Sequence, residues 1–422
     1  MFLDSARLSA EEAATVFAQP PIKIDASLVV PDEWMSGVGF TVEKVAISDG
    51  FNNTYTVVHE LGNRQATSDY HLRQVIREIR ALQTLDEQSR AGVFGDAMKG
   101  GLMAPVEGAK ALATAPVETT KGAAKGMGRW IANVSRGATS KDPYQENAAS
   151  AAAGWAGTKR AFALELGVDP WTDWDPLQKA LSSVARAAFA GGITASLGME
   201  ALAGDGTFGA VVGIAGLTGE LNGMLADNPA ALVTKINSEK LESAGFSKGL
   251  VSSFMLNYQY TPMEKSLLVQ SVLRMENASG RDLILGYAAA APDRVLARYR
   301  TQQAEMMANY YADVATFDIV KIGEALWLAT GKGALVGIQP IDYLAWTEEV
   351  ANVTALAAGS QEKDREIWLE GSAGPDARQA LTANGWTVND RVALVTGQPL
   401  QQVTAEGAGL GVTGTVIKTI TQ

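Results

Sequence analysis

The sequence contains no cysteine and only two histidines, His59 and His71, among its 422 residues. The absence of cysteine excludes disulfides, thiolate catalysis and cysteine-ligated metals. His59-Glu60 resembles the start of a zinc-protease helix, but Asn63 stands where the second histidine is required. Neither histidine has convergent partners for a Ser/His/Asp or metal site. We therefore predict no metal, no cofactor and no enzymatic activity.

Charge is also scarce, because Asp, Glu, Lys and Arg make up only 19% of the chain while hydrophobic residues make up 47%. This balance is typical of a globular protein with a sizeable core, not of a disordered one. The formal net charge of −11 argues against nucleic acid as a partner, since phosphate binding needs a basic surface. A signal peptide starts with basic residues followed by an apolar run, whereas this sequence has an acidic residue, Asp4, directly after its first three residues. We therefore predict no signal peptide in this chain.

A long run that is apolar enough for a confident transmembrane helix is likewise missing. The stretch 207–225 has about bilayer length, but Glu220 and many glycines lower its hydrophobicity. Glycines spaced four apart would still allow close helix approach, and Asp205-Gly206 could form the tip of a helical hairpin. Two interpretations of the region 184–225 stay open: a buried hairpin of a globular protein, or a hairpin that inserts into a membrane.

The most distinctive feature that is present is a repeat between Lys99 and Gly137. Ala-Pro-Val-Glu with a following lysine occurs at 104–110 and again eleven residues later, at 115–121. Eleven residues at about 100° each return almost to the same helical face. The range 91–141 contains seven Lys or Arg and three acidic residues, so its net charge is +4 and the rest of the chain carries −15. A basic segment in an acidic protein is either a solvated connection or a face for an anionic surface.

Proline at the start of each repeat unit and glycine within it favour short helices that need a support. The support is either the protein's own core or a membrane interface, for which an apolar stripe flanked by basic residues is suited. The predicted membrane or partner contacts are Lys110, Lys121, Lys125, Met127, Arg129, Trp130 and Ile131.

Alternating apolar residues and turn signals predict an N-terminal β-meander. Its strands are expected at 22–24, 38–47 and 54–58, with turns at 48–50 and 61–63. Apolar residues from Leu72 to Leu85 at helical spacing then predict one helix, capped by Ser68 or Asp69.

The rest of the chain predicts a helical middle and a small C-terminal α/β part. Helical patterns run over 147–167 and 228–312, with Asp175 before Pro176 as a helix start and Thr261 before Pro262 as another. After Phe317, short strands are expected around the Gly331-Lys332-Gly333 turn, with a helix over 375–381. Four tryptophans of this part, which either form its core or line a groove, are Trp327, Trp346, Trp368 and Trp386.

Three stretches carry a resemblance: 114–122 with Gly128-Arg129-Trp130, then 166–173, then 381–388. In these stretches the chain is similar to a family of uncharacterised, apparently exported bacterial proteins, over most of residues 50–390. The resemblance implies a periplasmic or cell-envelope location and brings no activity, cofactor or catalytic residue.

We thus expect an α+β, predominantly α-helical fold. Its predicted domains are 1–92 (β+α), 93–146 (basic repeat of short helices), 147–315 (helical) and 316–422 (α/β with a tail). The expected function is a non-enzymatic cell-envelope protein that associates peripherally with a membrane surface or a protein assembly through the basic repeat; a homo-oligomer is one such assembly. The alternatives are a pore-forming or membrane-inserting effector that uses 184–225, and an enzyme with a C-terminal groove.

Overall fold

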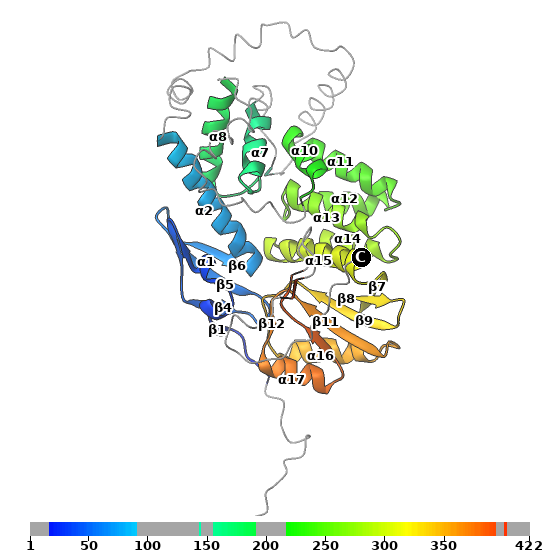
Figure 1. The fold of residues 1–422 in the computed structure, drawn as a ribbon. Coiled ribbons are helices and arrows are strands. Elements are labelled where there is room, and N and C mark those ends of the chain that lie inside the picture. The colour runs from blue at the N-terminus through cyan, green and yellow to red at the C-terminus, as the bar shows by residue number, and fades with distance from the viewer. Residues whose placement is uncertain (1–16, 91–142, 145–154, 191–216, 394–400, 403–422) are drawn as a thin grey trace, which may run out of the picture. The chain divides into compact units, whose positions relative to one another are not determined.

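The computed structural model describes residues 17–90, 143–144, 155–190, 217–393 and 401–402 (Figure 1). The described residues form a mixed α+β protein, as the sequence predicts. They belong to two compact units, each assembled from segments that are distant in sequence. Unit 1 comprises Met1–Ile76, Arg274–Ile284 and Gln302–Gln422, and unit 2 comprises Arg77–Leu273 and Leu285–Thr301. The domains expected from the sequence are, in contrast, four continuous ranges.

The first sheet of unit 1 is built around one long strand, β5, which alternates buried and exposed side chains. β5 pairs with β6 on one edge and with β3 and β4 on the other, always antiparallel. β1 pairs with β4, and β2 with β3. The elements of this part are β1 (Ile22–Asp25), the 3-10 helix η1 (Ala26–Leu28), α1 (Asp32–Met35), β2 (Ser36–Gly37), β3 (Phe40–Val42), β4 (Val45–Ser48), β5 (Asn53–His59) and β6 (Arg64–Thr67).

The prediction of one strand over 38–47 is wrong, because this stretch is divided into β3 and β4. The Glu43 amide still donates to the Thr56 carbonyl at 2.9 Å, so the pairing with β5 continues through the bend. At the same bend, the carbonyl of Lys44 accepts from the amide of Ala26. β3 and β4 thus pair with the same strand, β5, on one edge, whereas on the other edge β3 pairs with β2 and β4 with β1.

The second sheet of unit 1 has five strands in the order β13-β11-β9-β8-β7. β7, β8 and β9 form antiparallel hairpins, while β9, β11 and β13 run parallel and are linked by α16 and α17. Figure 1 shows both of these helices on one side of the sheet. Its elements are β7 (Phe317–Ile322), β8 (Ala325–Thr330), β9 (Ala334–Gln339), α16 (Glu348–Ala358), β11 (Asp364–Leu369), α17 (Pro375–Ala383) and β13 (Thr387–Asn389).

Two short ladders complete unit 1. β10 (Tyr343–Leu344) pairs in parallel with β12 (Ser372–Ala373), and β14 (Val392–Ala393) pairs antiparallel with β15 (Gln401–Gln402). The predicted turn at Gly331-Lys332-Gly333 is confirmed as the connection from β8 to β9. The helix α16 was not predicted from the sequence.

Unit 2 is helical. The described helices wholly inside it are α7 (Trp155–Glu165), α8 (Asp175–Ala190), α10 (Gly219–Asp227), α11 (Ala230–Ser243) and α12 (Lys248–Met255). Four described helices contribute residues to both units: α2 (Asp69–Arg90), α13 (Pro262–Arg274, through its last residue), α14 (Arg281–Ala289) and α15 (Arg294–Asp313). Among the described helices, none is long and apolar enough to cross a membrane.

Candidate functional site

The seven predicted contact residues lie outside the described residues. Lys110, Lys121, Lys125, Met127, Arg129, Trp130 and Ile131 all fall within 91–142, so the structure does not test them. It does describe the chain on both sides of this range. We therefore describe the candidate site through the residues on either side of this range, which are the end of α2 and the chain at Tyr144.

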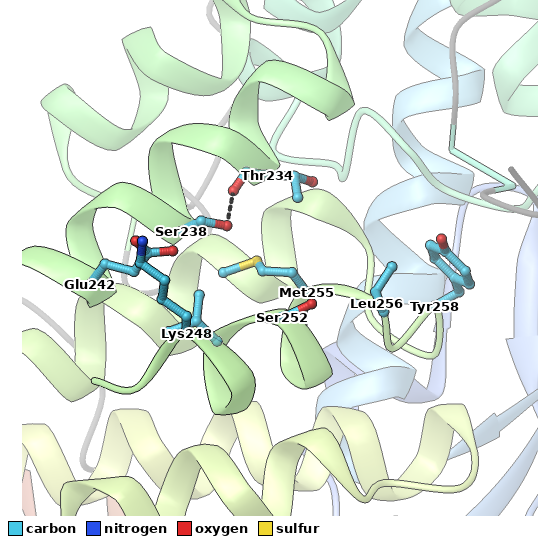
Figure 2. A pocket seen from close by; sticks show the side chains of 9 residues that line it. Thr234, Ser238, Glu242, Lys248, Ser252, Met255, Leu256 and Tyr258 are labelled. Carbon is cyan, nitrogen blue, oxygen red and sulfur yellow. Dashed lines mark hydrogen bonds between the residues drawn. The ribbon is translucent and has the colours of Figure 1, made fainter. Parts of the chain in front are cut away.

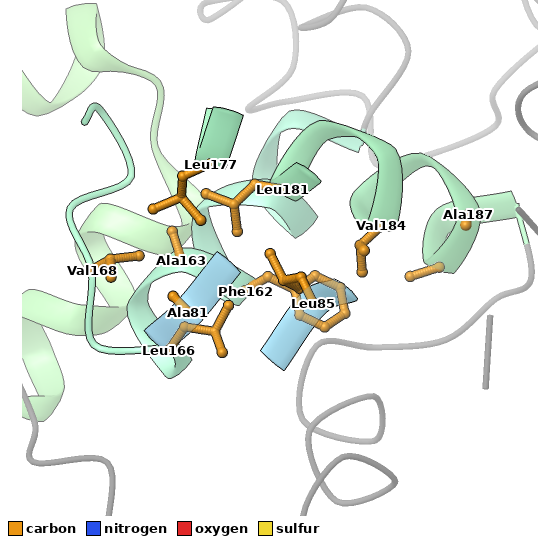
Figure 3. Close-up of a cluster of buried hydrophobic side chains, with 11 residues drawn as sticks. Ala81, Leu85, Phe162, Ala163, Leu166, Val168, Leu177, Leu181, Val184 and Ala187 are labelled. Carbon is orange, nitrogen blue, oxygen red and sulfur yellow. The ribbon is translucent and has the colours of Figure 1, made fainter. Parts of the chain in front are cut away.

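The helix before the segment is held by a compact apolar cluster (Figure 3). Leu85 of α2 packs there with Phe162 of α7 and Leu181 of α8, all at most 2% exposed. Burying side chains of this size contributes about 1.5 to 3 kcal/mol each. The full cluster consists of Ala81, Leu85, Phe162, Ala163, Leu166, Val168, Leu177, Leu181, Val184, Ala187 and Ala188. We call it the α2–α7–α8 cluster.

The chain after the segment is held at Tyr144. The Arg294 guanidinium donates to the Tyr144 hydroxyl oxygen at 2.6 Å, and the ring packs beside an apolar cluster that includes Trp171 and Met263. Burial raises the pKa of Tyr144 to about 12, so its hydroxyl stays neutral in the physiological range. Both described ends of the basic segment are thus fixed on unit 2.

Arg294 belongs to a partly buried charged cluster that joins three elements of unit 2. Thr261 and Glu264 form a capping box at the start of α13: the Glu264 amide donates to Thr261 Oγ1 at 3.1 Å, and the Thr261 amide donates to Glu264 Oε2 at 2.8 Å. The other oxygen of Glu264 lies 3.7 Å from Arg294 and 3.6 Å from Arg298. Thr261 Oγ1 also donates to Asp169 Oδ2 at 2.6 Å.

The electrostatics of this cluster are dominated by burial. Loss of solvent, and next the negative charge of Glu264, raise the pKa of Asp169 to about 7. Burial acts on Arg294 in the opposite direction, but Glu264 and other anions outweigh it and keep the pKa of Arg294 raised. The cluster can therefore hold a proton near neutral pH while it ties the loop after α7 to α13 and α15.

The apolar region 184–225 is described only at its two ends. Residues 184–190 form the end of α8, where Val184 is buried in the α2–α7–α8 cluster and Phe189 is 44% exposed. Thr218 caps α10 through the Leu221 amide. The proposed hairpin tip at Asp205-Gly206 lies outside the described residues.

A pocket of about 350 Å³ lies between α11 and α12 (Figure 2). Its volume is at the lower end of the range for small-molecule sites, roughly 300 to 1,000 Å³. Hydroxyl groups, one carboxylate and one ammonium group share it with apolar side chains. The lining residues are Thr234, Ser238, Glu242, Lys248, Val251, Ser252, Met255, Leu256 and Tyr258. No feature of the sequence predicted this pocket.

The two histidines have local structural roles. His59 Nδ1 accepts from the Leu61 amide at 3.1 Å, within the turn after β5, and burial lowers its pKa. His71 Nδ1 accepts from the Thr67 amide at 3.1 Å. In the part of the chain that the structure describes, no group of three or more His, Cys, Asp or Glu residues is placed to hold a metal ion.

The four C-terminal tryptophans are all buried, each at most 7% exposed, which supports the core interpretation over a groove. Trp327 and Trp386 pack against each other with ring centroids 5.3 Å apart, and Trp368 meets the Tyr310 ring edge-on. Trp368 also donates from its indole nitrogen to Glu366 at 2.7 Å.

Comparison with known proteins adds no relative: no family model, no curated protein and no solved structure matches this chain.

Asp169, Glu264 and Arg294 were not singled out as site residues from the sequence. The Thr-x-x-Glu pattern at 261–264 is a capping-box signal that could have identified Glu264 as a partner of Thr261. No local pattern connects Asp169 to Thr261, which are 92 residues apart.

Proposed function

We propose that the chain is a non-enzymatic protein of the cell envelope that associates peripherally with an anionic membrane surface through its basic segment, 93–146. The observation that carries this proposal is the charge distribution. The range 91–141 has a net charge of +4 and the remainder has −15, so attraction to anionic head groups is concentrated in one part of the chain. Met127, Trp130 and Ile131 would supply apolar contact beside Arg129.

The held ends of the segment support this proposal. The α2–α7–α8 cluster fixes the helix before it, and the bond from Arg294 fixes Tyr144 near its C-terminal end. Attachment through a segment with two fixed ends would bring the whole of unit 2 to the surface, because neither end can swing away as a free tail does.

The envelope location rests on the resemblance to apparently exported proteins. We also propose the finer architecture of the fold: along the chain, a helical middle part separates an N-terminal and a C-terminal part that each contain β-strands. A larger protein assembly, including copies of the chain itself, is the alternative partner for the same basic segment.

Vesicle flotation tests the proposal. Each Lys or Arg near an anionic surface contributes about 1 kcal/mol, so a change of Lys110, Lys121, Lys125 and Arg129 to Gln is expected to reduce binding to anionic vesicles at least tenfold. The protein should float with anionic vesicles and not with zwitterionic ones. Absent binding, or binding unchanged in the variant, would overturn the proposal.

A matched control removes the same number of positive charges elsewhere. It changes four exposed lysines of the described residues to Gln and should float like the unchanged protein: Lys23, Lys44, Lys332 and Lys363. Release of a dye enclosed in the vesicles separates the alternative, since peripheral association leaves the contents sealed whereas insertion of 184–225 would release them.

A further inference from the structure

A second charged cluster lies inside unit 1, where the first sheet meets the loop before β10. Asp342 is 7% exposed and both of its carboxylate oxygens accept backbone amides: Oδ2 from Asn53 at 2.7 Å and Oδ1 from Asp69 at 2.9 Å. Asp69 accepts the hydroxyl of Tyr55, which is fully buried. The side-chain amide of Asn53 in turn donates to the Tyr55 oxygen at 3.0 Å.

The backbone around Asp342 is the join between the first sheet and the C-terminal part of unit 1. The carbonyl of Phe51 accepts from the amides of both Asp342 and Tyr343, and the carbonyl of Gly50 accepts from Ala345 at 2.9 Å. On its other side, the carbonyl of Asp342 accepts from the amide of Ser372. Asp342 therefore bonds, through side chain and backbone, to three segments that are far apart in sequence.

The charges in this cluster do not balance. Three carboxyl groups interact here, those of Asp69, Asp342 and Glu370, and the Arg73 guanidinium interacts with two of them, Asp69 and Glu370. Arg73 is already paired with Glu370 at 2.5 Å, and Gln302 donates to the other oxygen of Glu370 at 3.1 Å. Within the described residues, neither Asp69 nor Asp342 forms an ion pair, because Arg73 is paired directly with Glu370 and attracts Asp69 only from a longer distance.

Two adjacent carboxylates with little solvent cannot both stay ionised at low cost. Burial is the main cause that raises the pKa of both groups, with Asp69 adding to the effect on Asp342. Because both oxygens of Asp342 accept N–H donors, which favour the ionised form, geometry favours Asp69 as the carboxyl group that is protonated. The other groups of the cluster are the neutral Tyr55 and the Arg73–Glu370 pair.

We propose that Asp69 and Asp342 form a proton-dependent clasp that holds the turn at 50–53 and the start of α2 against the segment 341–345. The clasp is closed when one carboxyl group of the pair is protonated. It loosens when the second carboxyl ionises, because two negative charges then repel each other within one buried site. This regulation is independent of the basic segment and of the proposed membrane association.

Hydrogen exchange of the two donor amides, Asn53 and Asp69, tests the clasp in the full chain. After correction for the intrinsic pH dependence of exchange, their protection should fall on the order of tenfold between pH 5.5 and pH 8. Asp69→Asn supplies a neutral side chain that can still accept from Tyr55, so protection should become independent of pH. Asp364→Asn, at an exposed position of β11, should behave like the unchanged protein.

Protection that does not change with pH in the unchanged protein, or a fall that persists in D69N, would overturn the clasp. If D69N does not fold, carbon-13 titration of the labelled aspartate carboxyls of the unchanged protein decides. A carboxyl signal assigned to Asp69 or Asp342 that titrates above pH 5.5 supports the clasp, whereas titration of both near pH 4 refutes it.

Discussion

Asp169 shows how one half-buried carboxyl group couples the stability of unit 2 to pH. It accepts from the Trp171 amide at 2.8 Å and from Thr261 at 2.6 Å, beside the buried Glu264. Its pKa is raised from 3.8 to about 7, mainly by burial and next by Glu264. The folded state therefore binds a proton that the unfolded state has already lost above pH 4.

We predict that Asp169 contributes stability that is fully present below about pH 4 and is lost as the pH rises toward 7. Asp169→Asn keeps an acceptor for Trp171 and removes the titration. We compare the free energy of unfolding of this variant with that of the unchanged protein at each pH. The difference, variant minus unchanged protein, should increase by on the order of 2 kcal/mol from pH 4 to pH 8. Solvent access to this half-buried group limits the size of the effect. Urea unfolding at both pH values measures it, and an equal difference at the two would contradict the prediction.

At the level of single residues, local chemistry was predictable and distant partners were not. Thr261 as a cap before Pro262 is confirmed, because the signal lies within four residues. Asp169 is one of three aspartates between residues 169 and 175, and its role is defined by distant contacts, with Thr261 and Glu264. Tertiary packing brings these groups together, and no spacing in the sequence records it.

Among the elements, those with a strong period and clear turns were predictable. The strands β1, β5, β7, β8 and β9 and the helices α2 and α17 lie where alternation, glycine turns and proline starts place them. The division of 38–47 into β3 and β4 depends on which strands pair with each edge, which is information from outside the stretch. The short ladder of β10 and β12 has two residues per strand, too few for a period.

The packing of β12 against the loop before β10 leaves no space for a side chain at Gly371. A Cβ atom there would lie 1.9 Å from the carbonyl oxygen of Asp342, which is backbone and cannot turn aside. We predict that Gly371→Ala lowers the free energy of unfolding by about 1 to 3 kcal/mol, the usual cost of overpacking. Thermal unfolding measures the loss.

Gly331→Ala is the matched control, because a Cβ atom at Gly331 meets nothing within 4 Å. It should change the free energy of unfolding by less than about 0.5 kcal/mol. Equal effects of the two substitutions would show that the close approach at Gly371 is not what constrains this position.

For the whole molecule, long-range assembly and charge distribution matter most. Unit 1 combines residues before position 77 with residues after position 301, and the Phe51 and Asp342 contacts are one place where they join. Such pairing is not visible in a single sequence, because turn signals and periodicity describe neighbours along the chain only. The uneven distribution of charge, by contrast, can be counted directly from the residues.

That distribution leads to a prediction about salt. Residues 91–141 carry a net charge of +4 and would be attracted to an anionic surface, whereas the rest of the chain carries −15 and would be repelled. The attraction therefore depends on a few charges close to the head groups. Screening shortens the Debye length from about 10 Å at 0.1 M salt to about 3 Å at 1 M. Partition onto anionic vesicles should therefore fall on the order of tenfold between 0.1 and 0.5 M NaCl.

The variant with Gln at 110, 121, 125 and 129 should show a much weaker salt dependence, since it lacks the charges that salt screens. Binding that salt leaves unchanged in both proteins would assign the attachment to apolar contact and not to the basic residues.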